Sequence, residues 1–516
     1  MLRSTWMTAV VAIIVSVTNA TTATTHKLIT CLQNIKSGSK SYLVTPSTGD
    51  YAKDRYGFNY AFDFKPSAIY HAASNADAAA AIKCAAASKV AVAPRSGGHS
   101  YEGYSIGGRD GALVIDLNLL QHFAVNKETR VATIGAGSRL GPIYANLWKA
   151  GKYLIPAGTC PTVGVGGHAL GGGIGLTTRK YGVLADNVIG MTFIDSTGTV
   201  NMVSKSSNQD LFWALRGAGG GSFGLVTEFQ IQAYNAPSVL THVSIEWPLS
   251  NYSAVLDAYG AWARTATDDI MVLVHMRSTL ITFTGVYLGT QAGAHAAVAG
   301  MLASAPQPPI PAKFEETGWY EEATRLADLK NGTLESPVTN DLHYARGRSL
   351  VYRKPLSTEE KDTIYKYLSN PPKVGSASLI IIDIWGGKVD RPDVPSAFDS
   401  HRGVLYGIQF IADWADSESP PGLRPCDDCL KWSADFVRDM QKAYHSSGGS
   451  LEGYQNYIER DMPNYLDAYY GNSLPRLKTI KKAVDPGNLF RFPQGIPVSD
   501  GRSVRVEMED RRYELF

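Results

Sequence analysis

The sequence predicts a two-domain α+β protein, and three observations support this. The chain has 516 residues, 44% of them hydrophobic, which is more than one hydrophobic core usually organises. Helical and strand patterns are mixed in residues 27–236, whereas alternation of aromatic and β-branched residues dominates residues 237–449. Residues 450–516 form a further C-terminal segment. We therefore place the domain boundaries near residues 236 and 449.

The first domain combines regular elements with glycine-rich loops. An Ala-rich helix is predicted from Asn75, and strands are predicted at Val90–Pro94 and Leu113–Leu117. Glycine-rich stretches follow strand-like runs, where backbone without Cβ atoms can approach a ligand closely. These stretches are Gly97–Gly108, Gly135–Gly141, Gly164–Gly175 and Gly217–Gly224. Their spacing predicts one large ligand surrounded by several loops.

The second domain is predicted to contain a large sheet. Strand-like alternation marks Leu240–Trp247 and Ile270–Met276. Residues Leu379–Trp385 are apolar at positions of both faces, which predicts a central strand in a sheet covered on both sides. Only Asp383 interrupts that strand. In the C-terminal segment a helix is predicted around Arg476–Val484, before the stop signal Asp-Pro-Gly.

The N-terminus, residues 1–23, has the character of a secretory signal peptide. Arg3 precedes an apolar stretch from Met7 to Val17, and small residues around Ala20 and Ala23 would permit cleavage. The apolar stretch is short for a membrane span, and no other segment approaches the roughly 20 apolar residues that a bilayer requires. We expect a secreted, extracellular protein; a buried N-terminal helix is the alternative. Two glycosylation sequons are consistent with secretion.

Five cysteines in an exported chain leave one over after pairing. Cys426 and Cys429 lie three positions apart, which favours a local disulfide over a redox motif, and no second Cys or His pair completes a zinc site. No metal is expected. Cys31 and Cys84 could then tie down the N-terminus. Cys160 remains among glycines in a polar turn, where a reactive thiol is expected more than a structural one.

The charge balance narrows the classes of partner. Lys and Arg number 49 and Asp and Glu 47, giving a formal charge of +2, and no long run of one sign occurs. Nucleic acid and anionic membranes bind through concentrated positive charge. Neither is therefore expected as a partner, and we expect a monomer that acts on a small molecule.

Two motifs carry the chemistry. Pro94–Tyr101 is a strand end followed by a glycine turn, whose successive amides can bind a pyrophosphate. Gly158–Gly175 is much longer than a chance glycine cluster. Within it, Gly164–Ala169 formally matches the dinucleotide-binding pattern G-x-G-x-x-G/A. A Rossmann domain is still disfavoured, because no hydrophobic strand precedes the match and the next acid, Asp186, lies in a predicted loop.

In this order and spacing the motifs resemble the flavoprotein oxidases of the vanillyl alcohol oxidase superfamily, in its berberine bridge enzyme-like branch. Further stretches that carry the resemblance are Asp210–Gly217, Ser396–Phe398, His401–Arg402 and Asp485–Phe490. The resemblance implies an FAD domain of the PCMH type, to which the C-terminal segment returns, and a substrate domain built on an antiparallel sheet. It also implies that His99 bonds the flavin 8α-methyl group and Cys160 bonds the flavin C6.

The resemblance and the motifs together give a set of cofactor-binding residues. They comprise the glycine turn, the long glycine-rich segment and two positions further along the chain. The set is Arg95, Ser96, Gly97, Gly98, His99, Ser100, Gly158, Thr159, Cys160, Val165, Gly167, His168, Gly172, Gly175, Val226 and Gln494. For His168, plain packing is an equally good interpretation.

Within the branch, the chain is most similar to fungal glucooligosaccharide and chitooligosaccharide oxidases. That similarity implies Tyr457 as catalytic base and Asp383 as its partner; a core aromatic and a structural carboxylate are the alternatives. A tyrosine has a pKa of about 10, so we expect the surroundings, with the oxidised flavin and Arg or Lys groups offsetting Asp383, to favour its phenolate. Tyr101, Trp385 and Tyr454 are assigned to the sugar site, although Trp385 replaces a different ring in some relatives.

The expected reaction is oxidation of the anomeric carbon of an oligosaccharide reducing end to a lactone, with O2 reduced to H2O2. A secondary-metabolite oxidase acting on alkaloid or phenolic precursors is the first alternative. A dehydrogenase with another electron acceptor is the second. The third is a catalytically silent carbohydrate-binding protein, which the presence of both His99 and Cys160 argues against.

Overall fold

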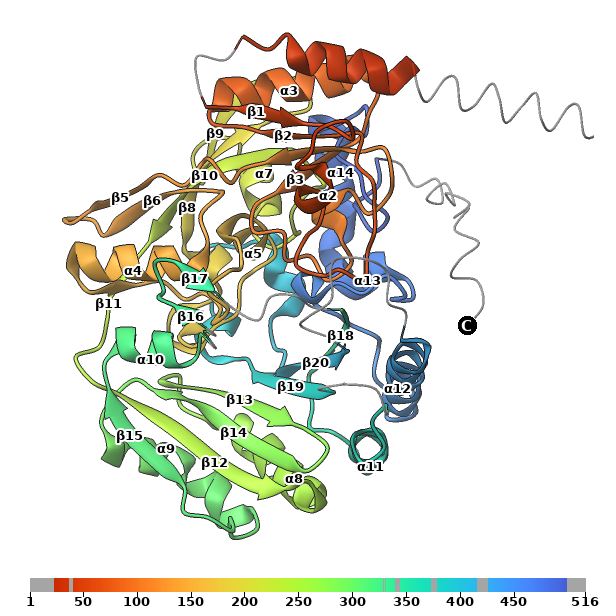
Figure 1. Cartoon of the computed structure of the whole chain (residues 1–516). Coiled ribbons are helices and arrows are strands. Elements are labelled where there is room, and N and C mark those ends of the chain that lie inside the picture. The colour runs from red at the N-terminus through yellow and green to blue at the C-terminus, as the bar shows by residue number, and fades with distance from the viewer. Residues whose placement is uncertain are drawn as a thin grey trace, which may run out of the picture.

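The computed structural model describes residues 23–36, 40–327, 329, 331–338, 344–372, 378–414 and 426–498. The predicted signal peptide lies outside these residues, apart from Ala23, at which a helix over residues 23–33 begins in the described part. Two large apolar cores organise the rest. The first contains elements from the N-terminal half together with the C-terminal segment, and the second contains the middle of the chain. Figure 1 shows these as an upper and a lower body.

A four-stranded sheet opens the upper body, in the order β1-β2-β4-β3. Its strands are β1 (Tyr42–Val44), β2 (Ala68–His71), β3 (Val92–Arg95) and β4 (Leu113–Asp116), with β2 and β3 parallel to β4. Helix α3 (Asn75–Ser88) begins at the predicted residue, where the Ser74 hydroxyl accepts a hydrogen bond from the Asp77 amide. Short helices α2 (Tyr51–Asp54) and η1 (Tyr104–Ile106) flank this sheet.

An antiparallel five-stranded sheet follows, in the order β5-β6-β10-β8-β9. Its strands are β5 (Phe123–Asn126), β6 (Val131–Gly135), β8 (Val188–Ile194), β9 (Val200–Ser204) and β10 (Leu225–Gln232). Between them lie α4 (Leu140–Gly151), β7 (Tyr153–Leu154), α5 (Val165–Leu170), α6 (Thr178–Tyr181), η2 (Leu184–Asn187), α7 (Gln209–Ala214) and β11 (Tyr234–Asn235). The long glycine-rich motif thus contains helix α5 of the upper body.

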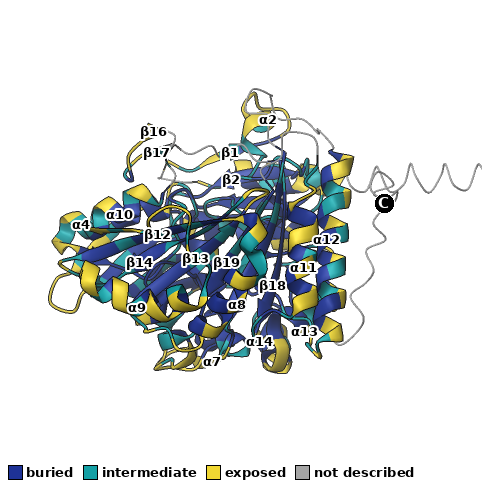
Figure 2. Cartoon of the chain, turned by 90° about the horizontal axis from the view of Figure 1, so that it is seen from below, coloured by how far each residue is buried: buried dark blue, intermediate teal, exposed yellow. Residues whose placement is uncertain are grey.

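The lower body is an antiparallel seven-stranded sheet, in the order β15-β12-β14-β13-β19-β20-β18. The strands are β12 (Leu240–Pro248), β13 (Ile270–Met276), β14 (Leu280–Tyr287), β15 (Lys313–Thr317), β18 (Ala345–Tyr352), β19 (Leu379–Ile384) and β20 (Tyr406–Asp413). Helices α8 (Tyr252–Ala263), α9 (Gln291–Ser304), α11 (Thr358–Leu368) and α12 (Asp427–Ser446) cover one face, as Figure 2 shows from below. Between the two bodies lie helix α10 (Trp319–Arg325) and a strand pair, β16 (Asn331–Gly332) and β17 (Pro337–Val338).

Strand β19 is interior in this sheet, as predicted, but it is not equally covered on both faces. Ile380, Ile382 and Ile384 are fully buried against the helices, whereas Leu379 and Ile381 on the opposite face are partly exposed. The second face is therefore covered around Asp383, which is 2% exposed, but not beside Leu379 and Ile381. An apolar run has the same appearance in both cases, because an aliphatic side chain at the wall of a cleft is chemically the same as one in a core.

The C-terminal segment packs into the upper body, where its last helices are drawn in blue beside the first elements of the chain (Figure 1). It contains η6 (Gln455–Tyr457), α13 (Tyr465–Tyr470), η7 (Gly471–Ser473) and α14 (Leu474–Val484). Three short helices occur earlier in the chain: η3 (Leu249–Asn251), η4 (Gly387–Asp390) and η5 (Ala397–His401). Buried Asp485 ends α14 and accepts hydrogen bonds from Lys481 and from the amides of Leu489 and Phe490. The Val92 amide donates to the Leu489 carbonyl, which joins the segment to β3.

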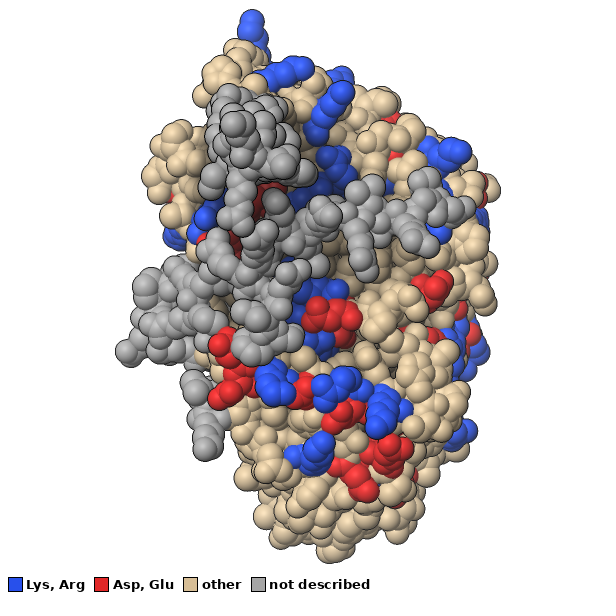
Figure 3. Space-filling view, turned by 90° about the vertical axis from the view of Figure 1, so that its right-hand side faces the viewer, with Lys and Arg blue, Asp and Glu red and all other residues tan. Residues whose placement is uncertain are grey.

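The charged side chains are interspersed on the surface. Figure 3 shows this on the side where α11 and α12 lie, and Lys431, Arg438 and Lys366 pair there with Asp435 or Asp439. Within the described residues, no helix combines the length and the apolar character that crossing a membrane requires. Both predicted disulfides, Cys31–Cys84 and Cys426–Cys429, are confirmed.

Candidate active site

The two glycine motifs lie against each other, although they are far apart in the sequence. A Cβ atom on Gly97 would collide with the backbone of Gly164, and one on Gly164 would collide with the Gly97 amide. The Ser96 hydroxyl donates to the Ala136 carbonyl and accepts from the Gly166 amide at 3.3 Å. Only residues without side chains permit this approach of two backbones. The contact therefore explains the glycines at the point where the motifs meet.

His99 and Cys160 lie on these two touching loops, and both are partly exposed. The His99 ring stacks on Phe58, with 4.1 Å between ring centroids. The Cys160 sulfur lies 3.4 Å from the Thr162 hydroxyl oxygen. Because the other four cysteines form the two disulfides, Cys160 retains its thiol. The structure thus places a partly exposed imidazole and a partly exposed thiol on adjoining loops.

Exposed backbone continues from these loops along a glycine-lined surface. Gly167, in α5, is exposed, and a Cβ on it would meet nothing within 4 Å. Gly220, across from it, would place its Cβ 3.9 Å from the Gly167 Cα. Residues Ser96–Gly97 and Gly158–Cys160 are also partly exposed. Glycine backbone beside open space at Gly167 lets a large ligand approach closely, so the residues present fit FAD.

Several predicted cofactor residues support these loops. The His168 imidazole accepts a hydrogen bond from the Gly158 amide at 3.0 Å. Burial lowers the pKa of His168 to about 4, so the ring is neutral and can accept this bond. Gly98 and Gly172 have φ angles of 75° and 127°, which favour glycine. The Ser100 hydroxyl accepts from the Tyr104 amide.

Other members of the predicted set are buried and already bonded within the protein. Arg95 is 5% exposed, and its guanidinium binds Asp116 and Asp54. Gln494, at 4%, accepts from the Tyr104 hydroxyl and donates to the Glu459 carbonyl. Val226, also 4% exposed, lies in β10, Val165 is fully buried in α5, and Gly175 packs on the Ala157 carbonyl. Thr159 differs from these, because it is partly exposed beside Cys160. The Arg95 and Gln494 side chains thus hold loops in place.

The second half of the site is a ring of four side chains. The Tyr457 hydroxyl donates to Asp383 Oδ2 at 3.0 Å. Gln409 Nε2 lies 3.5 Å from the same oxygen, and Gln409 Oε1 accepts from the Tyr101 hydroxyl at 2.8 Å. Tyr101 closes the ring by stacking on Tyr457, with 6.1 Å between centroids and 12° between planes. The upper body, the sheet and the C-terminal segment all contribute to this ring.

Gln409 is the member that the sequence did not indicate. It lies on β20 directly opposite Ile381 of β19, two residues from Asp383. A side chain two positions from Asp383 shares its face, and a directly paired residue does too. Gln409 is the single amide side chain in the apolar run Tyr-Gly-Ile-Gln-Phe-Ile. A polar residue that interrupts an apolar strand, as Asp383 also does, could have indicated it.

Burial dominates the electrostatics of the ring. It raises the pKa of Asp383 to about 6, although hydrogen bonds from Tyr457 and Gln409 act to lower it. Burial, and then the negative charge of Asp383, raise the pKa of Tyr457 well above 10. The principal influences on Tyr457 all raise its pKa, so the expectation that cationic groups favour its phenolate is wrong. Near neutral pH, the pair is a protonated phenol donating to a carboxylate.

Trp385 and Tyr454 lie behind the ring. Each is 1% exposed, and their rings meet edge to face at 5.5 Å. The Tyr454 hydroxyl accepts from the Gly173 amide at 2.7 Å, which connects it to the long glycine-rich segment. Neither residue presents a face to solvent, so the assignment of Trp385 and Tyr454 to direct sugar contact is corrected to support of Tyr457 and of that segment. Tyr101, in contrast, is partly exposed.

Two family models match this chain. One, described as an FAD binding domain, covers residues 66–204, and the other, described as berberine and berberine like, covers residues 453–497. The glucooligosaccharide oxidase of Sarocladium strictum is 30% identical over 448 residues, which span 85% of this chain and 88% of that protein. The chitooligosaccharide oxidase of Gibberella zeae is 29% identical over 505 residues, 95% of this chain and 98% of that protein.

Solved structures agree in fold. A BBE-like protein of Physcomitrella patens superposes with a TM-score of 0.80 at 32% identity, over 92% of this chain and 99% of that one. A glucooligosaccharide oxidase from Acremonium strictum, described with a 6-S-cysteinyl, 8α-N1-histidyl FAD, gives a TM-score of 0.80 at 27% identity, over 91% and 99%. With the FAD-binding domain, the antiparallel sheet and the C-terminal berberine-like segment all present, this chain belongs to the berberine bridge enzyme-like family of FAD-linked oxidoreductases.

Proposed function

We propose that this enzyme oxidises the anomeric carbon at the reducing end of an oligosaccharide, giving a lactone, with O2 as the final acceptor and H2O2 as product. The observation that carries the proposal is the hydrogen bond from partly exposed Tyr457 to buried Asp383. A phenol held against a carboxylate can pass on the proton that an alcohol must lose. The named activities of the two oligosaccharide oxidases support the substrate class.

The residues of the chain would act on the proton of the reacting hydroxyl group. Tyr457 takes that proton while its own proton passes to Asp383 Oδ2, 3.0 Å away. No free phenolate is needed beforehand, which agrees with the raised pKa of Tyr457. Bound FAD supplies the acceptor for the hydrogen and the electron pair that leave the carbon. Tyr101, bonded to Gln409, would fix the position of the sugar beside Tyr457.

We further propose that His99 and Cys160 both bond the FAD covalently, as in the Acremonium strictum oxidase. Their partly exposed side chains on touching loops support this. After acid precipitation, His99→Ala and Cys160→Ala proteins should each stay yellow, and the double variant should release its flavin. Release of all flavin from either single variant would refute attachment at two points. The apolar stretch near the N-terminus supports export of the enzyme from the cell.

One observation favours a second candidate, an oxidase of phenolic or alkaloid alcohols. Leu379 and Ile381 share the face of Asp383, and Leu273 is paired directly with Asp383 on β13. All three are partly exposed. Aliphatic side chains make no hydrogen bonds to sugar hydroxyls, so this part of the wall suits an apolar substrate group.

An anaerobic reduction screen separates the two candidates. The purified enzyme is mixed with cellobiose, xylobiose, chitobiose, lactose or one of several phenols, and flavin absorbance is followed. We expect at least one oligosaccharide to bleach the flavin and its product to be an aldonic acid. Bleaching by phenols alone would exclude the carbohydrate proposal and support the second candidate. Re-oxidation by air with formation of H2O2 tests the role of O2.

A further inference from the structure

A buried network of charges lies next to the tyrosine ring. Arg346 and Arg348 project from β18 and are 6% and 5% exposed. Arg346 binds Glu102 at 2.8 Å, and Arg348 binds Glu459. Both carboxylates are fully buried or nearly so, at 0% and 1% exposure. Arg460 adds a second contact to Glu102 at 3.1 Å.

The two buried carboxylates belong to the segments that carry the two site tyrosines. Glu102 directly follows Tyr101, and Glu459 lies two residues after Tyr457. Each segment is therefore anchored to β18 by its own arginine. The amide of Glu459 is also fixed, since it donates to the Tyr469 hydroxyl at 2.9 Å.

Asp461 joins these two anchors. Its Oδ2 atom lies 2.7 Å from Arg346 Nη2 and 2.9 Å from Arg348 Nη2. Unlike the other carboxylates of the network, its side chain is half-exposed, at 54%. A buried ion pair gains little stability over apolar packing, so a network of this kind is better explained by the geometry that it fixes. Among the residues that the structure describes, Asp461 is the one carboxylate that contacts both arginines of β18.

We infer that Asp461 is a positioning residue for catalysis: by binding Arg346 and Arg348 together, it fixes the segment of Tyr101 relative to the segment of Tyr457. The inference rests on the proposed function, because it concerns the proton-transfer pair of that reaction. The expected consequence is a well-defined distance from the Tyr457 hydroxyl to Asp383, now 3.0 Å. Small displacements of reacting groups reduce rates steeply.

The decrease of activity at low pH depends on the distance between the Tyr457 hydroxyl and Asp383. Asp383 must be ionised to receive a proton, so activity falls as pH decreases through its pKa, about 6. The hydrogen bond from Tyr457 lowers that pKa. If the hydroxyl moves away, this lowering is lost, and the acid limb moves to higher pH. A general loss of stability would not produce such a shift at temperatures where the protein stays folded.

The test compares Asp461→Asn with Glu452→Gln. Glu452 is a matched control, because it lies in the same C-terminal segment and pairs with Arg353, immediately after β18, outside the tyrosine ring. We expect Asp461→Asn to retain its flavin, to reduce it about 10-fold to 100-fold more slowly, and to show an acid limb at higher pH. Asp461→Glu should recover part of the rate, and Glu452→Gln should behave as the unmodified enzyme. An unchanged rate and acid limb in Asp461→Asn would overturn the inference.

A crystal structure of the Asp461→Asn holoenzyme gives a measurement that needs no substrate. The Tyr457 to Asp383 distance should exceed hydrogen-bonding range, and an unchanged distance of 3.0 Å would overturn the inference. This separates the two proposals. If no sugar reduces the flavin of the unmodified enzyme, the proposed function fails, and the crystal structure alone decides the role of Asp461.

Discussion

Tyr457 is the residue whose hydroxyl is placed to exchange protons with a substrate alcohol. In Tyr457→Phe the ring still packs against Tyr454 and Tyr101, so the flavin should remain attached. The rate of anaerobic flavin reduction should fall by about 10²-fold to 10⁴-fold, as for loss of a general base. Tyr465→Phe is the control, since the Tyr465 hydroxyl donates to the Gly495 carbonyl, away from the ring. Undiminished reduction in Tyr457→Phe would remove Tyr457 as the base.

Asp383 should reduce stability while it serves activity. Its pKa is about 6 in the folded protein and about 3.9 in an unfolded chain. Between pH 4 and 6 the unfolded state therefore loses its proton first, and the free energy of unfolding decreases as pH rises. The Asp383→Asn variant has no carboxyl group at this position, so this decrease in unfolding free energy should not occur in it. Relative to the unmodified enzyme, the variant should gain on the order of 3 kcal/mol between pH 4 and pH 7, while its activity falls.

Urea unfolding of both proteins at pH 4, 5, 6 and 7 measures this prediction. The difference in unfolding free energy should widen with pH and level off near pH 7, about one unit above the pKa of Asp383 in the folded protein. A constant difference across the series would show that the Asp383 carboxyl titrates as in an unfolded chain.

At the level of elements, strand β18 contacts the charge network through two of its side chains and the tyrosine ring through the glycine between them. Arg346 and Arg348 bind the charge network, and Gly347 between them lies beneath the ring of Tyr101. A Cβ on Gly347 would lie 2.7 Å from the Tyr101 Cε2 atom, closer than packed atoms approach. The strand therefore needs glycine at this position for Tyr101 to reach Gln409.

Gly347→Ala should displace Tyr101 and lower the free energy of unfolding by about 1–3 kcal/mol. If Tyr101 lines the sugar site, KM should rise as well. Gly300→Ala is the control, because Gly300 lies exposed in α9 with nothing within 4 Å of an added Cβ. That control should gain about 0.5–1 kcal/mol from helix propensity. Thermal unfolding and steady-state kinetics measure both, and equal stability of the two variants would contradict close packing at Gly347.

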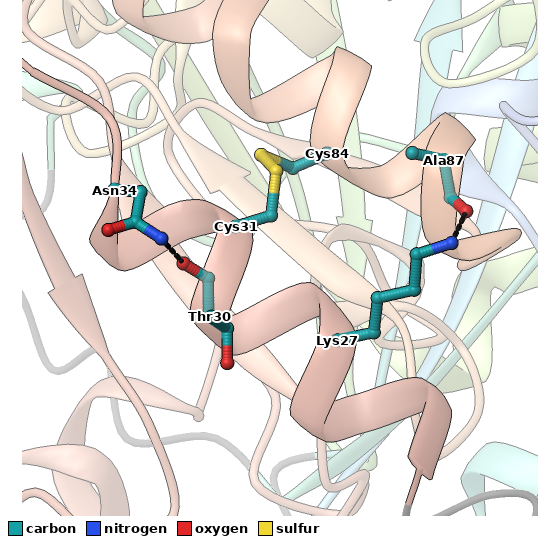
Figure 4. The surroundings of a disulfide bond; sticks show 6 residues. All are labelled: Lys27, Thr30, Cys31, Asn34, Cys84 and Ala87. Atoms are coloured by element: carbon teal, nitrogen blue, oxygen red, sulfur yellow. Dashed lines mark hydrogen bonds between the residues drawn. A yellow bond between two sulfur atoms is a disulfide. The ribbon is translucent and has the colours of Figure 1, made fainter.

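At the level of the whole molecule, the Cys31–Cys84 disulfide holds the N-terminal helix to α3 across 53 residues (Figure 4). Lys27 strengthens this contact by donating to the Ala87 carbonyl. Replacing both cysteines by serine should cost about 2–5 kcal/mol, because closing a long loop restricts the unfolded chain strongly. The Cys426–Cys429 disulfide closes a three-residue separation and should contribute less. Thermal unfolding of the two double variants ranks them, and the reverse order would contradict this reasoning.

The sequence predicted the local elements well where one pattern decides them. The helix from Asn75 and the strand Ile270–Met276 occur at the predicted residues, because capping and alternation are properties of neighbouring residues. Assignments that depend on surroundings were less successful. Trp385 was assigned to a sugar-stacking surface, yet it is packed between Phe398 and Tyr454. Burial depends on what lies across the space, which the sequence of one strand does not contain.

By itself, the sequence determined the family and the chemistry available: two glycine motifs, a histidine, a cysteine outside the disulfides and a tyrosine. These are properties of residue type and spacing. Only the tertiary structure decided that Tyr101, Asp383, Gln409 and Tyr457 form one ring, and that Asp461 connects its two sides. The physical reason is that the four come from separate segments, whose meeting is fixed by packing of the cores and by buried ion pairs rather than by local preference.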